Sequence, residues 1–203
     1  MKIIDVIQGS DEWLNARKGK IGGTALGDLY SKYGKRKIGF YEVLAGRLAV
    51  DPDDEDRRER GLRLEETVVE LFEKQYKKKI ERVGICISDE NPNIYNSPDG
   101  LIKNNNKYTE AVEIKCLSSA RHLQVVVENK VPSEFIPQCM QYAIVNPDLK
   151  TLYVVFYDDR IISKPLHIIE INRKDIEDEI LLFKDFQLEQ LKELDKLTEE
   201  LSW

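Results

Sequence analysis

The residues best suited to chemistry form a short Glu-x-Lys pattern, Glu113 and Lys115. The surrounding segment 110–117 reads as a strand, and alternate side chains of a strand point to the same face, so this carboxylate and this ammonium lie side by side. The carboxylate can hold a hard cation while the ammonium orients or activates an attacking water, as phosphodiester hydrolysis requires. An isolated pattern of this kind is also typical of an ordinary ion pair on an exposed strand.

A second acid, Asp99, lies in the segment Ser97–Gly100, whose Pro-Asp-Gly sequence is typical of a turn. Taken alone, the Pro-Asp-Gly turn is enough to explain an aspartate at position 99. A short hairpin separates it from Glu113, however, and two carboxylates brought together by a hairpin are oxygen ligands of the kind that Mg²⁺ prefers.

A third acid, Glu65, lies on a predicted helix over 62–79. The helical spacing places it on the same side as apolar residues such as Val68. An unpaired charge on that face is costly. Glu65 therefore lies at the edge of the face, pairs with Arg60 or Arg63, or binds a metal, and spacing alone does not decide among these.

Gln138 lies in a further predicted helix, over 133–145, within a stretch that is otherwise almost wholly apolar. A buried amide needs hydrogen-bond partners. Gln138 either bonds a water molecule at a metal site or is a core glutamine satisfied by the backbone.

The elements that must position these residues alternate between helical and strand patterns. Helices are predicted over 62–79, 133–145 and 175–201, and strands over 82–88, 96–102, 110–117, 151–157 and 167–172. Such alternation predicts an α/β protein (an α+β mixed sheet) flanked by helices. We find no internal repeat and no linker, so the 203 residues are expected to form a single domain.

Composition excludes several classes of protein. No apolar run is long enough to span a bilayer, and the N-terminus does not resemble a signal peptide. The three cysteines are widely spaced, which disfavours a disulfide framework and indicates a cytoplasmic protein. The net charge of −6 argues against nucleic-acid binding, although cations are clustered in 32–37, 57–63 and 74–82. Each cluster is either a solvated face or a track for phosphates.

Taken together, the acids, the Glu-x-Lys pattern and the helix carrying Gln138 resemble the PD-(D/E)xK nuclease core. The N-terminal segment is similar to the opening of the YqaJ-type viral recombinases, the family that includes lambda exonuclease. The resembling residues there are Gln8–Ser10, Glu12–Trp13, Arg17–Ile21 and Thr24.

This resemblance implies a restriction-endonuclease-like αβββαβ core with additional N- and C-terminal helices. It divides the single domain into an N-terminal helical segment, 1–60, a catalytic core, 61–173, and a C-terminal helix, 174–203. The implied activity is a 5′ to 3′ exonuclease that digests one strand of linear double-stranded DNA and leaves a 3′ single-stranded tail for recombination.

The resemblance also implies the metal ligands. Two Mg²⁺ ions, with Mn²⁺ as a substitute, would be held by Glu65, Asp99, Glu113 and the backbone carbonyl of Ile114. No iron–sulfur cluster is expected, because related clusters need four thiolates and the chain has three.

By the same resemblance, Lys115 with help from Gln138 would position the hydrolytic water. Arg17 and Thr24 match the arginine and hydroxyl that grip the 5′-terminal phosphate in the family, which commonly has serine where Thr24 stands. The family forms rings that encircle DNA, so a homo-oligomer such as a trimer is expected. A single-strand annealing recombinase is the expected partner, in a host cytosol and of phage or prophage origin.

Three alternatives remain open. The first is an endonuclease of the same chemistry, acting in repair or restriction. The second is a non-catalytic module that binds DNA ends, which the intact acid set disfavours because a binder gains nothing from it. The third is a protein-interaction module built on the acidic loop 51–56 and the terminal helix.

Overall fold

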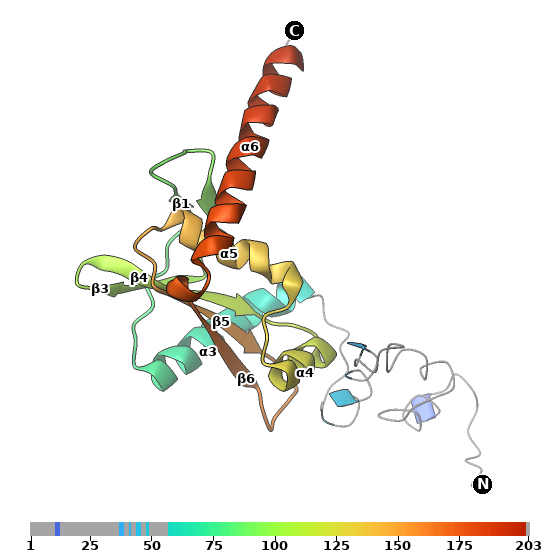
Figure 1. Cartoon of the computed structure of the whole chain (residues 1–203). Coiled ribbons are helices and arrows are strands. Elements are labelled where there is room, and N and C mark those ends of the chain that lie inside the picture. The colour runs from blue at the N-terminus through green and yellow to red at the C-terminus, as the bar shows by residue number, and fades with distance from the viewer. Residues whose placement is uncertain are drawn as a thin grey trace. The chain divides into compact units, whose positions relative to one another are not determined.

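The computed structural model describes residues 57–201, together with 11–12, 37–38, 41, 44–45 and 48. Along the chain from residue 57 the main elements are α3 (Arg57–Tyr76), β1 (Cys86–Ile87), β2 (Tyr95–Asn96), β3 (Gly100–Asn104), β4 (Lys107–Lys115), α4 (Ser119–Glu128), α5 (Ile136–Val145), β5 (Thr151–Tyr157), β6 (Leu166–Asn172) and α6 (Glu177–Leu201), as Figure 1 shows. They confirm the predicted α/β class with a sheet and flanking helices.

The chain divides into two compact units. One contains Leu64–Lys115, Val131–Val155 and Ile168–Trp203, and we call it the acid unit; the other, Met1–Arg63, Cys116–Lys130 and Phe156–His167, we call the ion-pair unit. The residues predicted to do chemistry at the acids all belong to the acid unit.

A four-stranded sheet in the order β3-β4-β5-β6 carries Glu113 on β4, while Asp99 lies immediately before β3 and Glu65 lies on α3. β3 and β4 form an antiparallel hairpin in which Gly100 lies opposite Val112. Its turn uses Asn105 and Asn106 with φ of 48° and 66°, a left-handed conformation that asparagine tolerates better than most residues. The predicted strand 151–157 is confirmed, and its side chains from Leu152 onward are buried, as its continuous apolar run required.

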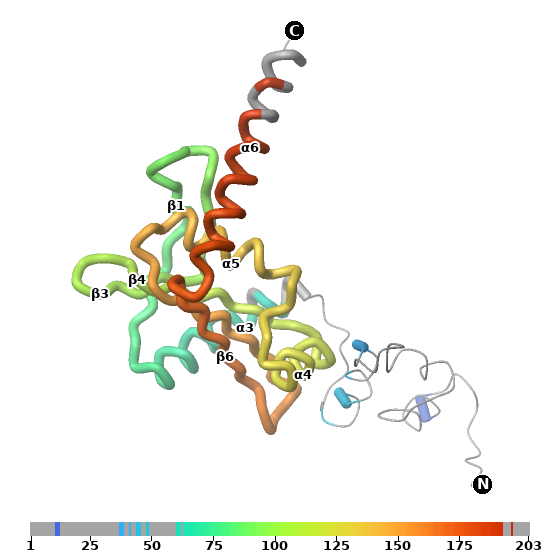
Figure 2. The backbone as a smooth tube through the Cα atoms, viewed as in Figure 1, coloured from blue at the N-terminus to red at the C-terminus, as the bar shows by residue number. Residues whose placement is uncertain are grey.

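Within the acid unit, helices pack on both faces of this sheet. Phe72 of α3 makes an edge-to-face contact with Tyr153 of β5, their ring centroids 5.1 Å apart. On α5, Tyr142 reaches β4, where its hydroxyl lies against the Glu113 carboxylate. α6 in turn packs against α5, as the tube in Figure 2 also shows. Val68 and Phe72 are fully buried, which confirms the apolar stripe predicted for the first helix.

Three predicted elements and one that was not predicted differ from the expectation. The predicted strand 96–102 is divided between β2 and β3, which belong to different sheets. The segment predicted as the strand 82–88 contributes only Cys86 and Ile87 to a two-stranded sheet with β2, outside the four-stranded one, and Ile87 is exposed. Its apolar residues do alternate, but among the described residues Ile85 and Ile87 are exposed. α4 was not predicted, because its run of valines is β-branched and disfavours a helix locally. The helix predicted from Ser133 begins as a 3₁₀ turn, Ser133–Phe135, before α5.

Among the residues that the structure describes, no helix has both the length and the apolar character to cross a bilayer.

Candidate active site

The β3–β4 hairpin brings Asp99 to the strand that carries the Glu-x-Lys pattern. Asp99 immediately precedes β3, and the antiparallel register places it beside the end of β4. The backbone N–H of Ile114 donates a hydrogen bond to Asp99 Oδ2 over 2.6 Å. The hairpin geometry therefore joins the first and second acids, as their spacing in the sequence suggested.

Glu113 is the most deeply buried of the acids, with a side chain only 3% exposed. Its Oε1 accepts from the Lys115 ammonium over 2.5 Å and from the Gln138 amide over 2.7 Å. Its Oε2 accepts from the Tyr142 hydroxyl over 2.5 Å. A buried carboxylate with three charged or polar donors is held in one orientation, which suits a residue that must present an oxygen to a ligand.

Lys115 and Gln138 are themselves in contact. The Lys115 ammonium donates to Gln138 Oε1 over 2.9 Å and lies 5.0 Å from the centroid of the Phe135 ring. Gln138 thus accepts from the lysine and donates to Glu113, so its amide is satisfied by side chains of the site and not by backbone alone. The expectation of a buried amide was wrong, because Gln138 is exposed, and it is therefore not a core glutamine. Its contacts place it beside Glu113 and Lys115, and its bond to a water molecule stays a prediction.

Glu65 lies at the edge of the apolar stripe of α3, with 28% of its side chain exposed. The predicted alternatives paired it with Arg60 or Arg63. These arginines instead pair with Asp159 in the ion-pair unit. The partner of Glu65 is Arg82, whose guanidinium bonds both Glu65 Oε1 and the backbone carbonyl of Asp99. Sequence spacing could not show this pairing, because the turn after α3 folds Arg82 back over the helix.

The acids influence one another electrostatically. Burial, reinforced by the nearby charges of Glu113 and Glu65, raises the pKa of Asp99 to about 6 despite the favourable hydrogen bond from Ile114. Burial and the neighbouring acids therefore disfavour the ionised form of Asp99.

Tyr142 is a residue of the cluster that sequence reasoning missed. Its buried hydroxyl donates to Glu113 and accepts from the Asp99 N–H over 3.3 Å, so that it bridges two of the acids. Burial and the Glu113 charge raise the pKa of this phenol, which keeps it protonated as a donor. The available signal was its spacing of one helical turn from Gln138, which puts both on one face of α5.

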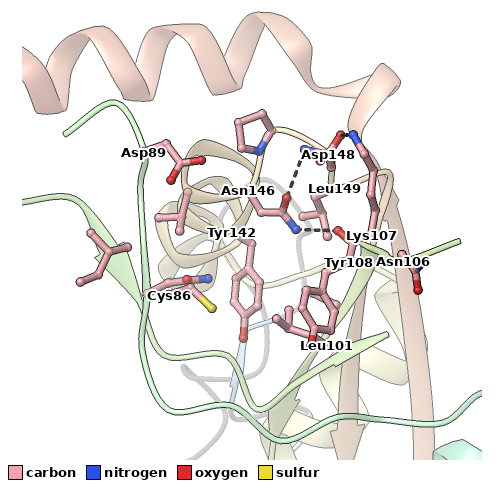
Figure 3. A pocket seen from close by; sticks show the side chains of 15 residues that line it. Cys86, Asp89, Leu101, Asn106, Lys107, Tyr108, Tyr142, Asn146, Asp148 and Leu149 are labelled. Carbon is pink, nitrogen blue, oxygen red and sulfur yellow. Dashed lines mark hydrogen bonds and ion pairs between the residues drawn. The ribbon is translucent and has the colours of Figure 1, made fainter. Parts of the chain in front are cut away.

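On its other side, the Tyr142 ring lines a cavity of about 330 Å³ in the acid unit, drawn in Figure 3. Tyr108, Asn146 and Asp148 also line it, and the Asn146 amide donates to the Tyr108 carbonyl over 2.7 Å. Tyr142 therefore separates this cavity from the acids.

The donor set fits a hard divalent cation. Carboxylates and a backbone carbonyl are the oxygen ligands that Mg²⁺ takes, and the predicted set of Glu65, Asp99, Glu113 and the Ile114 carbonyl is of this type. In the described part of the chain, however, no three His, Cys, Asp or Glu side chains form a group that could hold a metal ion. Lys115 engages Glu113, and Arg82 engages Glu65.

The predicted 5′-phosphate residues, Arg17 and Thr24, lie outside the described residues, as does most of the N-terminal segment that carries the family resemblance.

Comparison with known proteins identifies relatives. The sequence model of the YqaJ-like viral recombinase domain matches residues 12–148. No curated protein sequence matches. The fold is similar to the crystal structure of LHK-Exo in complex with dAMP, with a TM-score of 0.60 at 23% identity over 94% of this chain and 97% of that one. It is also similar to the alkaline exonuclease LHK-Exo from Laribacter hongkongensis, with a TM-score of 0.56 at 23% identity over 95% and 100% of the two chains.

Proposed function

Because the chain belongs to the YqaJ-like viral recombinase domain family, we propose that it is a metal-dependent deoxyribonuclease, an exonuclease that digests one strand of linear duplex DNA from 5′ to 3′ and leaves a 3′ single-stranded tail. The observation that carries this proposal is the single hydrogen-bonded cluster of Asp99, Glu113, Lys115 and Gln138. The fold of the chain, which is similar to that of a solved alkaline exonuclease structure, also supports the proposal.

In this proposal, Glu65, Asp99, Glu113 and the Ile114 carbonyl hold two Mg²⁺ ions, with Mn²⁺ as a substitute. When bound, such ions polarise the phosphodiester and stabilise the charge that develops on the attacking and leaving oxygens. Asp99 and Glu113 are the acids best placed to share a cation, because the hydrogen bond between Asp99 and Ile114 ties one directly to the strand of the other.

Lys115 and Gln138 act on the water. The Lys115 side chain is 19% exposed, so it contacts the protein acids and is also open to substrate and solvent. Its ammonium orients the attacking water by donating a hydrogen bond from Nζ, while the Gln138 amide keeps Nζ oriented through the 2.9 Å hydrogen bond.

The family resemblance supports the proposed substrate and assembly. Arg17 and Thr24 grip the 5′-terminal phosphate, which makes a linear end the point of entry. The chain works as a single nuclease domain in a homo-oligomeric ring such as a trimer, in a bacterial cytosol with a phage or prophage recombination system and a single-strand annealing partner.

The proposal is tested with linear duplexes that carry either a phosphate or a hydroxyl on each 5′ end and a label on one strand. Digestion should require a divalent cation, stop with chelator, prefer the 5′-phosphate, and release label from the 5′ end first. Lys115→Ala and Glu113→Gln should be inactive, with a thermal melting curve of each variant as the control that it is folded at the assay temperature.

The same assay separates the alternatives. Cutting of covalently closed circles, with no effect of the 5′ phosphate, would identify an endonuclease of the same chemistry. Binding to DNA ends without turnover at any divalent cation would identify a non-catalytic end-binding module.

A further inference from the structure

Arg82 occupies the acid site as a cation. Its Nη1 donates to Glu65 Oε1 and to the Asp99 carbonyl, the latter over 2.5 Å, and its Nη2 lies 3.6 Å from Glu66 Oε2. One guanidinium therefore joins the acid on α3 to the turn that carries the second acid. The side chain is 42% exposed, so part of the guanidinium also faces solvent.

This contact conflicts with a metal ion at the same carboxylate. A guanidinium is always charged and cannot release its proton to make room for a second cation. A divalent ion on Glu65 would share the carboxylate with a positive group already bonded to it, and the two cations repel. Binding of the metal must therefore weaken or break the bond between Arg82 and Glu65.

A phosphodiester provides the natural second partner for the released guanidinium. Guanidinium and phosphate match in geometry and charge and form paired hydrogen bonds. Arg82 has the exposure and the position to meet a phosphate that approaches the acids, and its bond to the Asp99 carbonyl does not depend on the charge of Glu65.

We propose that Arg82 is a metal-responsive clamp: it neutralises Glu65 in the metal-free protein and, once a divalent cation binds there, turns to a phosphate of the DNA strand at the site. The DNA arm of this inference rests on the proposed function, whereas its metal arm does not. Because each step favours the other, metal and DNA bind cooperatively, and by linkage each raises the affinity for the other by the same factor.

The test begins with the protein alone. Titration of Mg²⁺ or Mn²⁺ into DNA-free protein, followed by calorimetry, should give a Kd about 3- to 10-fold lower for Arg82→Gln than for wild type, because the competing cation is gone. A role in which Arg82 merely scaffolds Glu65 predicts the reverse, weaker metal binding, and either weaker or unchanged metal binding overturns the proposal.

The second measurement is DNA affinity. Fluorescence anisotropy with a 5′-phosphorylated duplex in Ca²⁺, with a gel to verify that the duplex stays intact, should show about 5- to 20-fold weaker binding for Arg82→Gln. Arg82→Lys keeps the charge but loses the paired hydrogen-bond geometry, so its DNA affinity should lie between those of wild type and Arg82→Gln. It serves as the variant if Arg82→Gln fails to fold. DNA affinity equal to wild type in both variants overturns the clamp.

Two control variants isolate the effect. Lys79→Gln also removes one positive charge from this segment, but Lys79 is 84% exposed and pairs with Glu73, so metal affinity should change less than about 2-fold. Glu66→Gln removes the more distant, 76% exposed partner of Arg82 and should likewise leave metal affinity within about 2-fold of wild type. If wild-type protein binds metal but cleaves no DNA, the proposed function fails while the titration still decides whether Arg82 competes for Glu65.

Discussion

The two units of the chain shift the pKa of a carboxyl group in opposite directions. In the ion-pair unit, Asp158 is fully buried, and its Oδ1 accepts from Arg60 Nη2 over 2.7 Å and from Arg160 Nε over 2.8 Å. Both arginines also donate to the Leu117 carbonyl, over 3.2 and 3.3 Å. Burial alone would raise the pKa of Asp158, but the hydrogen bonds and charge of Arg160 outweigh it and the pKa lies below its ordinary value.

In the acid unit the balance is reversed. The carboxyl of Asp99 keeps a backbone hydrogen bond, yet burial and the other acids raise its pKa to about 6. Asp99 is partly buried beside two other acids, whereas Asp158 is fully buried and accepts hydrogen bonds from Arg160. Compensated charge ties elements together, whereas uncompensated charge creates an affinity for something that the chain does not itself supply.

The comparison predicts that the acid unit can lose activity without losing stability. Lys115→Ala should reduce the rate of DNA cleavage by about 10²- to 10⁴-fold, because it removes the group that positions the attacking water. Single-turnover cleavage of a linear duplex measures the effect.

Denaturant unfolding of Lys115→Ala provides the control. Lys115 sits beside a buried acid, so a small loss of stability is expected, but the midpoint should stay close to that of wild type. If unfolding accounted for the loss of activity, Lys115 would belong with the structural ion pairs and the contrast between the units would disappear.

The ion-pair unit should respond in the opposite manner. Asp158→Asn keeps the shape but leaves two buried guanidinium groups short of their counter-charge, and removal of one partner from a buried ion pair costs about 3–5 kcal/mol. Equilibrium unfolding in urea measures this loss.

The neighbouring Asp159→Asn is the matched variant. Asp159 is 36% exposed and also bonds Arg60, over 2.6 Å, so its loss should cost less than about 1 kcal/mol. Equal effects of the two substitutions would contradict the view that burial of Asp158 makes its charge structural.

These contrasts show which features were predictable from sequence. The strand 151–157 and the face of Glu65 followed from periodicity, because local spacing determines which side of an element a residue takes. The convergence of Asp99 and Glu113 followed from the hairpin between them. The partner of Glu65 did not, since the pairing with Arg82 depends on how a turn folds back, and spacing along a helix carries no information about that.

The ion-pair unit was missed for a related reason. Arg60 was considered as a partner of Glu65 and as part of the cation cluster 57–63, either a solvated face or a track for phosphates. Both interpretations were wrong for Arg60, which is buried and pairs with Asp158, far along the chain. Tyr142 was missed because a tyrosine among apolar residues reads as core. Its hydroxyl has a role only because the tertiary structure places Glu113 beside it, and the sequence does not show that contact.

Tyr142 sharpens the comparison, because it is a neutral donor to a buried charge. Tyr142→Phe should lower the free energy of unfolding by about 1.5–3 kcal/mol, the usual effect of losing a hydrogen bond to a charged group. Urea unfolding measures the loss. Metal titration should give a higher Kd, because Glu113 is less well oriented.

Tyr95→Phe is the control, since Tyr95 is 58% exposed and the loss of its hydroxyl should change stability by less than about 0.5 kcal/mol. A neutral effect of Tyr142→Phe would mean that Lys115 and Gln138 alone hold Glu113 in place.

The smallest expected effect concerns the pH dependence of the metal-free fold. A carboxyl whose folded pKa is raised to about 6 binds its proton more tightly in the native state than in the unfolded chain. Its contribution to stability is therefore fully present below the unfolded pKa, near 4, and is lost as the pH rises through about 6. Above that pH, the ionised Asp99 destabilises the metal-free protein.

Asp99→Asn should accordingly be more stable than wild type at pH 8 by about 1–2 kcal/mol, discounted for partial exposure, and the advantage should shrink toward pH 4.5. Thermal melting in chelator across this range measures it, with Asp148→Asn, which loses only a surface ion pair to Lys107, as the control. Added Mg²⁺ should then stabilise wild type at pH 8 and do so less at pH 5.5, where protons compete for Asp99, while Asp99→Asn responds weakly at both. A variant less stable than wild type at pH 8 would show that the charge of Asp99 is compensated, as that of Asp158 is.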